Sequence, residues 1–468
     1  MASGNISLRA GVLWLPNVFG VRAEQTDQPG KRLCEVWDVV ASESVARARK
    51  NGPEIPNSGR QRGSSVTENP QVSGPAIPGR NEPRLLSARP GHCFLQSASR
   101  EQTVTSIKAL RTSADLIHAG LASPGRQSEL EAVAARYAVA ITPAFVDLID
   151  PHNASDPIAR QFIPNIAELD SREEEHADPI GELVHSPIEG IVHRCPDRVL
   201  LKLVNVCAVY CRFCFRRETV GQKGSGLLSN EVLAAALAYI RARPEIWEVI
   251  LTGGDPLVLS PRRMRDVMKA LEAIDHVKIL RIHTRVPVAA PDWVTRALIR
   301  ALRVEGKAVY VVLHANHPRE LTAAARAACA RLIDAGIPML SQSVLLSGVN
   351  DDAETLGALM RALVESRVKP YYLHHADLAP GTAHLRTSIP TGQALMRALR
   401  ARHSGLCQPT YVLDIPGGHG KVPIGPNHLI DLNDTGTCQV EDGNGCRHTY
   451  PPCDRPHTPE GETCHPIG

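Results

Sequence analysis

The chain has 468 residues, of which 43% are hydrophobic and 22% charged, and its formal net charge at pH 7 is +3. This composition suits a soluble globular protein with one large domain and additional segments. The nearly balanced charge gives no argument for binding nucleic acid or a membrane surface, and no apolar run approaches the ~20 residues that span a bilayer.

Residues 1–100 are rich in Gly, Pro, Ser and Arg and show neither helical nor strand periodicity. Such a segment cannot bury a hydrophobic core, so we predict a disordered extension. Residues 11–21 resemble the apolar core of a signal peptide, but Pro16 interrupts it and no clear small-residue cleavage site follows. We therefore expect the protein to stay in the cytoplasm.

Residues 101–190 carry apolar side chains at intervals of three and four, as in QSELEAVAARYAV at 127–139. This period is typical of amphipathic helices. The segment is predicted to be a helical lead-in to the main fold.

Residues 191–430 alternate between strand-like and amphipathic helical segments. Six strand-like segments are rich in aliphatic and β-branched residues: RVLLKLVN, WEVILTGG, VKILRIHTRV, AVYVVLHAN, PMLSQSVLL and KPYYLHHAD. Strand–helix units of about 30 residues predict parallel strands with right-handed crossovers. We predict an α/β fold, a partial six-stranded (β/α)6 barrel with a helical lead-in and irregular terminal extensions. Its chemistry is expected at the carboxyl ends of the strands.

Three cysteines follow the first of these strands at the spacing C-x3-C-x2-C: Cys207, Cys211 and Cys214. Thiolates at this spacing can bind three irons of a [4Fe–4S] cluster and leave the fourth iron open for a small molecule. A zinc knuckle and three unrelated buried cysteines are the alternatives, but zinc sites usually have four ligands in paired modules. The spacing resembles the signature of radical S-adenosylmethionine (SAM) enzymes. That resemblance implies SAM on the open iron, a reducing electron donor and reducing surroundings.

Two further motifs lie at predicted strand or loop ends. Gly253, Gly254 and Asp255 lie in LTGGDP, which ends the second strand. The two glycines lack side chains and so let the backbone approach a ligand closely, although an ordinary turn is the alternative. Lys421 follows the glycine-rich loop in IPGGHGK. A lysine amine can form a Schiff base with an aldehyde such as pyridoxal 5′-phosphate (PLP), although a solvated surface lysine is the commoner case.

Residues 431–468 lose the strand–helix alternation and form an irregular, cysteine-containing tail. Its cysteines and histidines are Cys438, Cys446, Cys453, Cys464, His448, His457 and His465. They could make a zinc site, but the gaps between them are long and irregular.

Ordered matches over about residues 150–430 resemble the lysine 2,3-aminomutase family of radical SAM enzymes. They include HSPIEGIVHRCPDRVLLK, CAVYCRFCFRRETVG, LTGGDPL, QSVLLSGVND, YYLHHADLAPGTAHLRT and PTYVLDIPGGHGKVPIGP. The resemblance implies an isomerase that converts L-lysine to β-lysine by 1,2-amino migration. It also implies a [4Fe–4S] cluster with SAM, and PLP held by Lys421.

Carried over by position, the resemblance makes Arg216 the partner of the substrate carboxylate, a role that suits the planar guanidinium fork. Asp377 and Asp414 match the acids that hold the remote ammonium of lysine, and two carboxylates would offset its desolvation. Arg198 and Gln342 match positions near PLP. The GGD residues match the motif that contacts the amino group of SAM.

Further residues near these motifs have less definite roles: Arg194 is a third candidate near PLP, and His314, His317, His374, His375 and His419 are interpreted as structural.

Two positions depart from the family pattern. Cys195 stands where a tyrosine would lie against PLP, and Asp352 stands where a cysteine would contribute to an intersubunit zinc site. We therefore expect weaker packing around PLP and no zinc-linked oligomer; the sequence leaves open whether the chain forms a homo-oligomer.

Three alternative functions remain. The same isomerisation could serve β-lysylation of elongation factor P, a branch favoured by CRFCFRR and by NASDPIARQFIP. Another amino acid such as glutamate could be the substrate, although carboxylates at 377 and 414 would repel an anionic side chain. A non-enzymatic iron–sulfur or zinc-binding protein would leave Lys421 and its acidic partners without a role.

Overall fold

A computed structural model describes residues 109–221, 226–432, 437–443 and 445–451. The predicted disordered extension at 1–100 and most of the tail lie outside these residues. Within them, the main feature is a nine-stranded sheet whose strands follow chain order from β1 to β9. Its strands are β1 (Ile191–Cys195), β2 (Arg198–Val204), β3 (Glu248–Gly253), β4 (Ile279–Thr284), β5 (Ala308–His314), β6 (Met339–Leu345), β7 (Val368–His375), β8 (Thr410–Ile415) and β9 (Gly420–Pro423).

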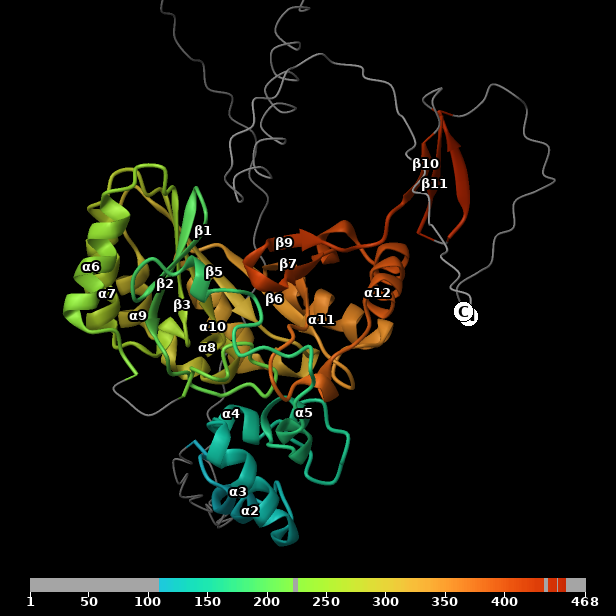
Figure 1. Cartoon of the computed structure of the whole chain (residues 1–468), viewed down its shortest axis with the longest axis horizontal. Helices are drawn as coiled ribbons and strands as arrows, with labels where there is room; N and C mark the ends of the chain where they lie inside the picture. The colour runs from blue at the N-terminus through green and yellow to red at the C-terminus, as the bar shows by residue number, and fades with distance from the viewer. Residues whose placement is uncertain (1–108, 222–225, 433–436, 444, 452–468) are drawn as a thin grey trace, which may run out of the picture. The chain divides into compact units, whose positions relative to one another are not determined.

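Strands β2 to β8 are all parallel, and β1 and β9 pair antiparallel at the two edges. The α/β fold and the six predicted strands, β2 to β7, are confirmed, and the sheet curls into a partial barrel (Figure 1). The sheet extends beyond these six strands. Residues 410–415 form a seventh parallel strand, because a further helix precedes them and completes another strand–helix unit.

Six helices of the barrel connect its parallel strands and cover their outer face (Figure 1). They are α6 (Asn230–Arg241), α7 (Pro261–Glu272), α9 (Arg296–Leu302), α10 (Ala323–Asp334), α11 (Ala353–Glu365) and α12 (Ile389–Arg402). Each begins after a Ser, Thr or Asp whose side chain accepts a hydrogen bond from the first turn. Asp352 is the cap of α11, which gives this residue a structural role independent of zinc.

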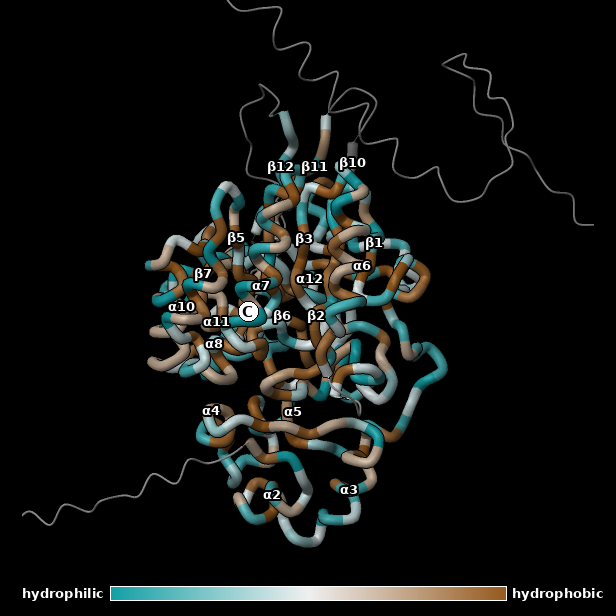
Figure 2. Tube along the Cα trace, turned by 90° about the vertical axis from the view of Figure 1, so that its left-hand side faces the viewer, coloured by the Kyte–Doolittle hydropathy of each residue, from teal (hydrophilic) through white to brown (hydrophobic). Residues whose placement is uncertain are grey.

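The hydrophobic core lies between the helices and the outer face of the sheet. Along β2, Val199, Leu201 and Leu203 are buried, whereas Arg198 and Lys202 are partly exposed. Because side chains alternate between the faces of a strand, the polar residues of β2 face the barrel interior. Hydrophobic segments accordingly run along the central strands in Figure 2.

Short helices precede the barrel within the segment predicted as a helical lead-in: α2 (Ser113–His118), α3 (Gln127–Arg136), α4 (Pro143–Val146) and α5 (Ala159–Phe162). Beyond β9, a separate three-stranded sheet contains β10 (Leu429–Leu432), β11 (Cys438–Glu441) and β12 (Arg447–Tyr450). The exact division into domains stays a prediction. No helix among the described residues is both long and apolar enough to cross a membrane.

Candidate active site

The three cysteines lie in the loop that follows β2 at the carboxyl edge of the sheet, and all three are free thiols. Burial raises the pKa of Cys207 well above its ordinary value and that of Cys214 to about 11. The protein alone therefore keeps these thiols neutral. Bound iron would supply the positive charge that ionises them, so the donor set fits a cluster.

No group of three or more His, Cys, Asp or Glu side chains in the described residues is arranged around a single metal ion. A [4Fe–4S] cluster does not require such an arrangement, because each thiolate binds a different iron. Of the tail cysteines, Cys446 is disulfide-bonded and Cys438 donates to the Tyr450 carbonyl oxygen at 3.4 Å. Zinc binding by the tail stays a prediction, because Cys453 and Cys464 lie outside the described residues.

The GGD residues at the end of β3 pack against the chain that leads into the cysteine loop. A Cβ atom on Gly253 would lie 2.2 Å from the Val204 carbonyl oxygen, and one on Gly254 would lie 2.2 Å from that of Val206. Asp255 accepts hydrogen bonds from the Thr284 hydroxyl and the Arg285 N–H. These residues hold the loop in place, and their contact with SAM stays a prediction.

Arg216 is paired with a residue that sequence analysis did not identify. Its Nε and Nη2 atoms donate to the two carboxylate oxygens of Glu182 at 2.9 and 2.5 Å. Its Nη1 donates to the Thr252 hydroxyl and the Gly253 carbonyl at 3.2 and 3.1 Å. Glu182 therefore binds the two-pronged edge of the Arg216 guanidinium that was expected to bind the substrate carboxylate. A substrate carboxylate would meet the remaining N–H group of Arg216.

Glu182 is placed by a close contact between two glycine turns. Gly181 has a φ of +65°, and a Cβ there would lie 2.3 Å from the backbone nitrogen of Gly418 in the loop before Lys421. The carboxylate also lies 3.7 Å from the Lys202 ammonium in the barrel interior. The sequence shows only an acid next to a glycine, and neither its burial nor its partner could be read from spacing.

Lys421 and Asp414 are direct cross-strand partners in the antiparallel pair of β8 and β9. The Lys421 ammonium donates to the Asp414 carboxylate and lies 3.2 Å from Nδ1 of His374. Arg194 donates to the other Asp414 oxygen at 3.3 Å. Burial alone would raise the pKa of Asp414, but the hydrogen bond with His374 and the charge of Lys421 hold it well below its usual range.

His374 therefore belongs to the candidate site, and its interpretation as purely structural is incomplete. By contrast, His375 binds the Tyr411 hydroxyl at 2.8 Å, and His317 caps a short turn. Sequence analysis missed His374 because β-strand alternation could place it on either face until the register of β7 was known.

Asp377, just after β7, has no ion pair or side-chain hydrogen bond within the described part of the chain. Burial and the negative charge of Asp414 raise its pKa to about 7, against the opposing charges of Lys421 and Arg216. The residue as a whole is half-buried. It is a deeply placed acid without a partner, next to the Lys421–Asp414 pair.

The two residues predicted near PLP face the same interior. Arg198 lies on β2 beside Asp197, to which it donates at 2.7 Å, and its charge acts on the Tyr372 hydroxyl. Gln342 is the direct neighbour of Tyr372 in the pairing of β6 with β7. The Lys421 ammonium lies 5.7 Å from the Tyr372 ring centre. Tyr372 is therefore close to Lys421, pairs with Gln342 and is influenced by the charge of Arg198. The N–H groups of Arg198, Gln342 and Lys421 could donate to an anionic cofactor, and the Tyr372 ring could pack against an aromatic one.

Cys195, at the end of β1, is a partly exposed free thiol paired in register with Arg198. Its place against PLP stays a prediction.

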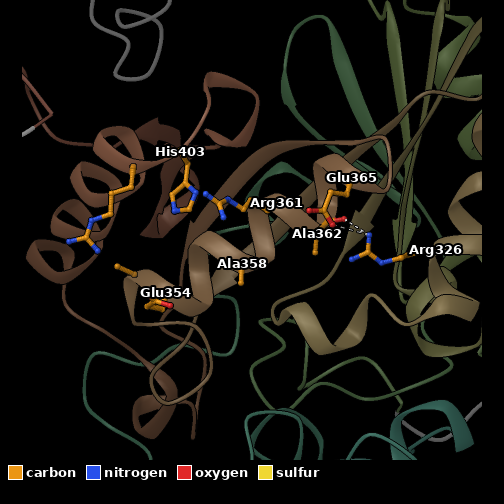
Figure 3. Close-up of a pocket in the computed structure, with 9 residues that line it drawn as sticks. Arg326, Glu354, Ala358, Arg361, Ala362, Glu365 and His403 are labelled. Carbon is orange, nitrogen blue, oxygen red and sulfur yellow. Dashed lines mark hydrogen bonds and ion pairs between the residues drawn. The ribbon is translucent and has the colours of Figure 1, made fainter.

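A pocket of about 500 Å³ also lies on the outer surface, among α10, α11 and α12 (Figure 3). Arg326, Arg361 and Glu365 are among the side chains that line it. It contains none of the predicted site residues. The cysteine loop and Arg216 instead follow β2, and Lys421 lies on β9 of the same sheet, so we look for the chemistry in the barrel interior.

Comparisons with known proteins identify the family of the chain. Residues 201–359 match the model of the radical SAM superfamily, and residues 396–457 match that of lysine-2,3-aminomutase. The L-lysine 2,3-aminomutase of Acetoanaerobium sticklandii is 42% identical over 295 residues, which cover 63% of this chain and 71% of that protein. The Escherichia coli L-lysine 2,3-aminomutase is 35% identical over 70% of this chain and 96% of its own length.

A glutamate 2,3-aminomutase from Clostridioides difficile is also similar, with 38% identity over 64% of this chain and 71% of that protein. The radical SAM domain implies a [4Fe–4S] cluster and SAM, and the aminomutase relatives imply PLP. The protein is an isomerase. By its sequence relatives and its barrel, the chain belongs to the lysine 2,3-aminomutase family of radical SAM enzymes.

Proposed function

We propose that the protein is a PLP-dependent lysine 2,3-aminomutase that converts L-lysine to β-lysine. The observation that carries this proposal is the unpartnered carboxylate of Asp377 beside the Lys421–Asp414 pair. A substrate ammonium would supply the positive charge that this carboxylate lacks. Its binding would lower the pKa of Asp377 from about 7 and keep the carboxylate ionised.

Glutamate is disfavoured by the same geometry. An anionic side chain would add a third negative charge beside Asp377 and Asp414, and it would raise the pKa of Asp377 further. Two acids in a shielded interior therefore support a substrate with a cationic side chain. We therefore propose lysine, and not glutamate, as the substrate of this chain.

The cofactors would be held at the two ends of the substrate. The cysteine loop would hold a [4Fe–4S] cluster with SAM, which supplies a radical that removes hydrogen. Lys421, Arg198 and Gln342 would hold PLP, which supplies an aldehyde that activates the substrate amine and spreads unpaired spin.

The chain's own residues would orient the substrate between these groups. Arg216, fixed by Glu182, would meet the α-carboxylate with its remaining N–H group. Lys421 must leave Asp414 before that carboxylate can join Asp377 around the substrate ammonium. His374, 3.2 Å from the Lys421 nitrogen, is placed to accept a proton from it.

Anaerobic assay of the reconstituted full chain tests the proposal. The mixture contains reductant, SAM, PLP and L-lysine, and β-lysine is followed by mass spectrometry. We expect β-lysine only when every component is present. Cleavage of SAM without β-lysine would contradict lysine as the substrate, and absence of SAM cleavage would contradict radical chemistry.

A second candidate is the same isomerisation in service of elongation factor P, favoured by the motifs CRFCFRR and NASDPIARQFIP. In both cases we place the protein in the cytoplasm with a reducing electron donor, because the cluster needs reducing surroundings. The test is whether a β-lysyl ligase attaches the enzyme's product to purified elongation factor P. Attachment would favour the role in elongation factor P modification, and its absence would favour free β-lysine as the end product.

A further inference from the structure

Arg285 contacts one of the cluster cysteines directly. It follows β4 at the carboxyl edge of the sheet, and its Nη1 atom donates to the sulfur of Cys211 at 3.2 Å. Among the described residues, no other side chain donates a hydrogen bond to the sulfur of Cys207, Cys211 or Cys214. The cysteine that receives this bond is therefore distinguished from the other two.

The guanidinium is fixed in this position by buried partners. Its Nη2 atom donates to Glu320 at 2.6 Å and to Gln161 at 2.9 Å. The Glu320 side chain is fully buried, and its other oxygen accepts hydrogen bonds from the backbone N–H groups of Asn316 and His317 at 3.0 Å each. The acid is held by backbone, so the arginine has one defined orientation.

Aromatic rings exclude water from the same place. The Arg285 guanidinium carbon lies 5.0 to 5.7 Å from the ring centres of Phe145, Phe162 and Phe213. The arginine side chain is only 6% exposed. Charges interact more strongly in such an environment than in water, because the effective dielectric constant is lower.

We propose that Arg285 raises the reduction potential of the cluster through its hydrogen bond to Cys211. Reduction adds one electron and no proton to the cluster, so the reduced form carries one more negative charge. A buried cationic donor at a ligating sulfur stabilises that form, and hydrogen bonds to sulfur are among the factors that set cluster potentials. Glu320 opposes part of this effect as the counter-charge and keeps Arg285 in place.

A purely structural role would not require the contact with sulfur. The nearby network of Arg212, Arg217 and Glu168 is also buried, with Arg212 donating to Glu168 at 2.5 Å. Neither arginine donates from its side chain to a cluster sulfur. The inference requires the cluster alone and does not depend on which amino acid is the substrate.

The test is the midpoint potential of the reconstituted full chain, measured without SAM by titration with dithionite and electron paramagnetic resonance. Two variants change the donor: R285K keeps a charge but loses the fork, and R285Q removes the charge. R319K is the matched control, because Arg319 is the neighbour of Glu320 and binds Asp156 at 2.6 Å. Iron content and melting temperature are measured for each protein.

We expect the reduced fraction of R285Q at a fixed solution potential to fall about tenfold, which for one electron is about 59 mV. R285K should lie between R285Q and the natural chain, and R319K should match the natural chain. Equal potentials in R285K and the natural chain at equal iron content would overturn the proposal. Folded R285K without a cluster would also overturn it, by showing that Arg285 serves assembly. If R285Q does not fold, R285K decides alone.

Discussion

The cysteine loop and the Lys421 region belong to the same sheet but differ in how their charges are paired. Around the cysteines, Glu168 lies between Arg212 and Arg217, and Glu320 binds Arg285. Every one of these buried charges has a counter-charge from the chain itself.

Around Lys421, by contrast, Asp377 has no counter-ion among the described residues. A buried polar group without a partner costs free energy, so such groups persist where function requires them. At the cluster end the buried charges are therefore paired by the chain itself, whereas the Lys421 end has capacity for a charged ligand.

Replacing Lys421 should give the largest effect. K421A removes the only proposed attachment for PLP, so lysine turnover should fall roughly 1,000-fold or more, about 4 kcal/mol in activation free energy. Borohydride should no longer trap PLP on the chain. K369A is the control, because Lys369 binds only the carbonyl oxygens of Leu406 and Gln408. Trapping of PLP on K421A would contradict the assignment.

Asp377 tests the unpaired charge. D377N should lower kcat/KM for lysine roughly 100-fold, as expected when one partner of a buried charge pair is lost. In the natural chain, kcat/KM should fall as pH falls through about 7, because protonation then removes the negative charge. The variant should lack that limb of the pH profile. A limb that persists in D377N would assign it to another group.

Gly254 tests the support at the cluster end. G254A would place a methyl group 2.2 Å from the Val206 carbonyl oxygen, so the loop that carries Cys207 must move. We expect a loss of about 2 kcal/mol in unfolding free energy and reduced iron content. In G405A the new methyl group meets nothing within 4 Å, and stability should be unchanged. Normal iron content in G254A would mean that the loop tolerates displacement.

Glu182 connects the two regions and should give the smallest effect. E182Q weakens the hold on Arg216, so KM for lysine should rise roughly tenfold with kcat changed less. E129Q is the control, since Glu129 makes a similar two-point contact with Arg126 at the surface. A lower KM in E182Q would show instead that Glu182 competes with the substrate carboxylate.

The fold was largely predictable because its strands are long, aliphatic and separated by amphipathic helices. The seventh parallel strand, β8, was missed because its residues were interpreted through the lysine loop that follows them. Local sequence patterns identify individual helices and strands well. They do not show how many strands a sheet contains when one strand, here β8, runs directly into a functional motif.

The candidate site was predictable where chemistry depends on spacing and not where it depends on contacts between distant segments. Cys207, Cys211 and Cys214 were found from their spacing, and Lys421 from its loop. Glu182 lies 34 positions from Arg216. The contact of Arg285 with Cys211 spans 74 positions. Such pairs form only when the strands come together, so neither could be inferred from the chain itself.

The central claim is that the unpaired end of the site recognises a cationic side chain. The most direct measurement is the ratio of kcat/KM for L-lysine to that for L-glutamate in the fully reconstituted enzyme, compared between the natural chain and D377N. The account predicts a strong preference for lysine that falls in D377N. Equal or better turnover of glutamate by the natural chain would contradict it.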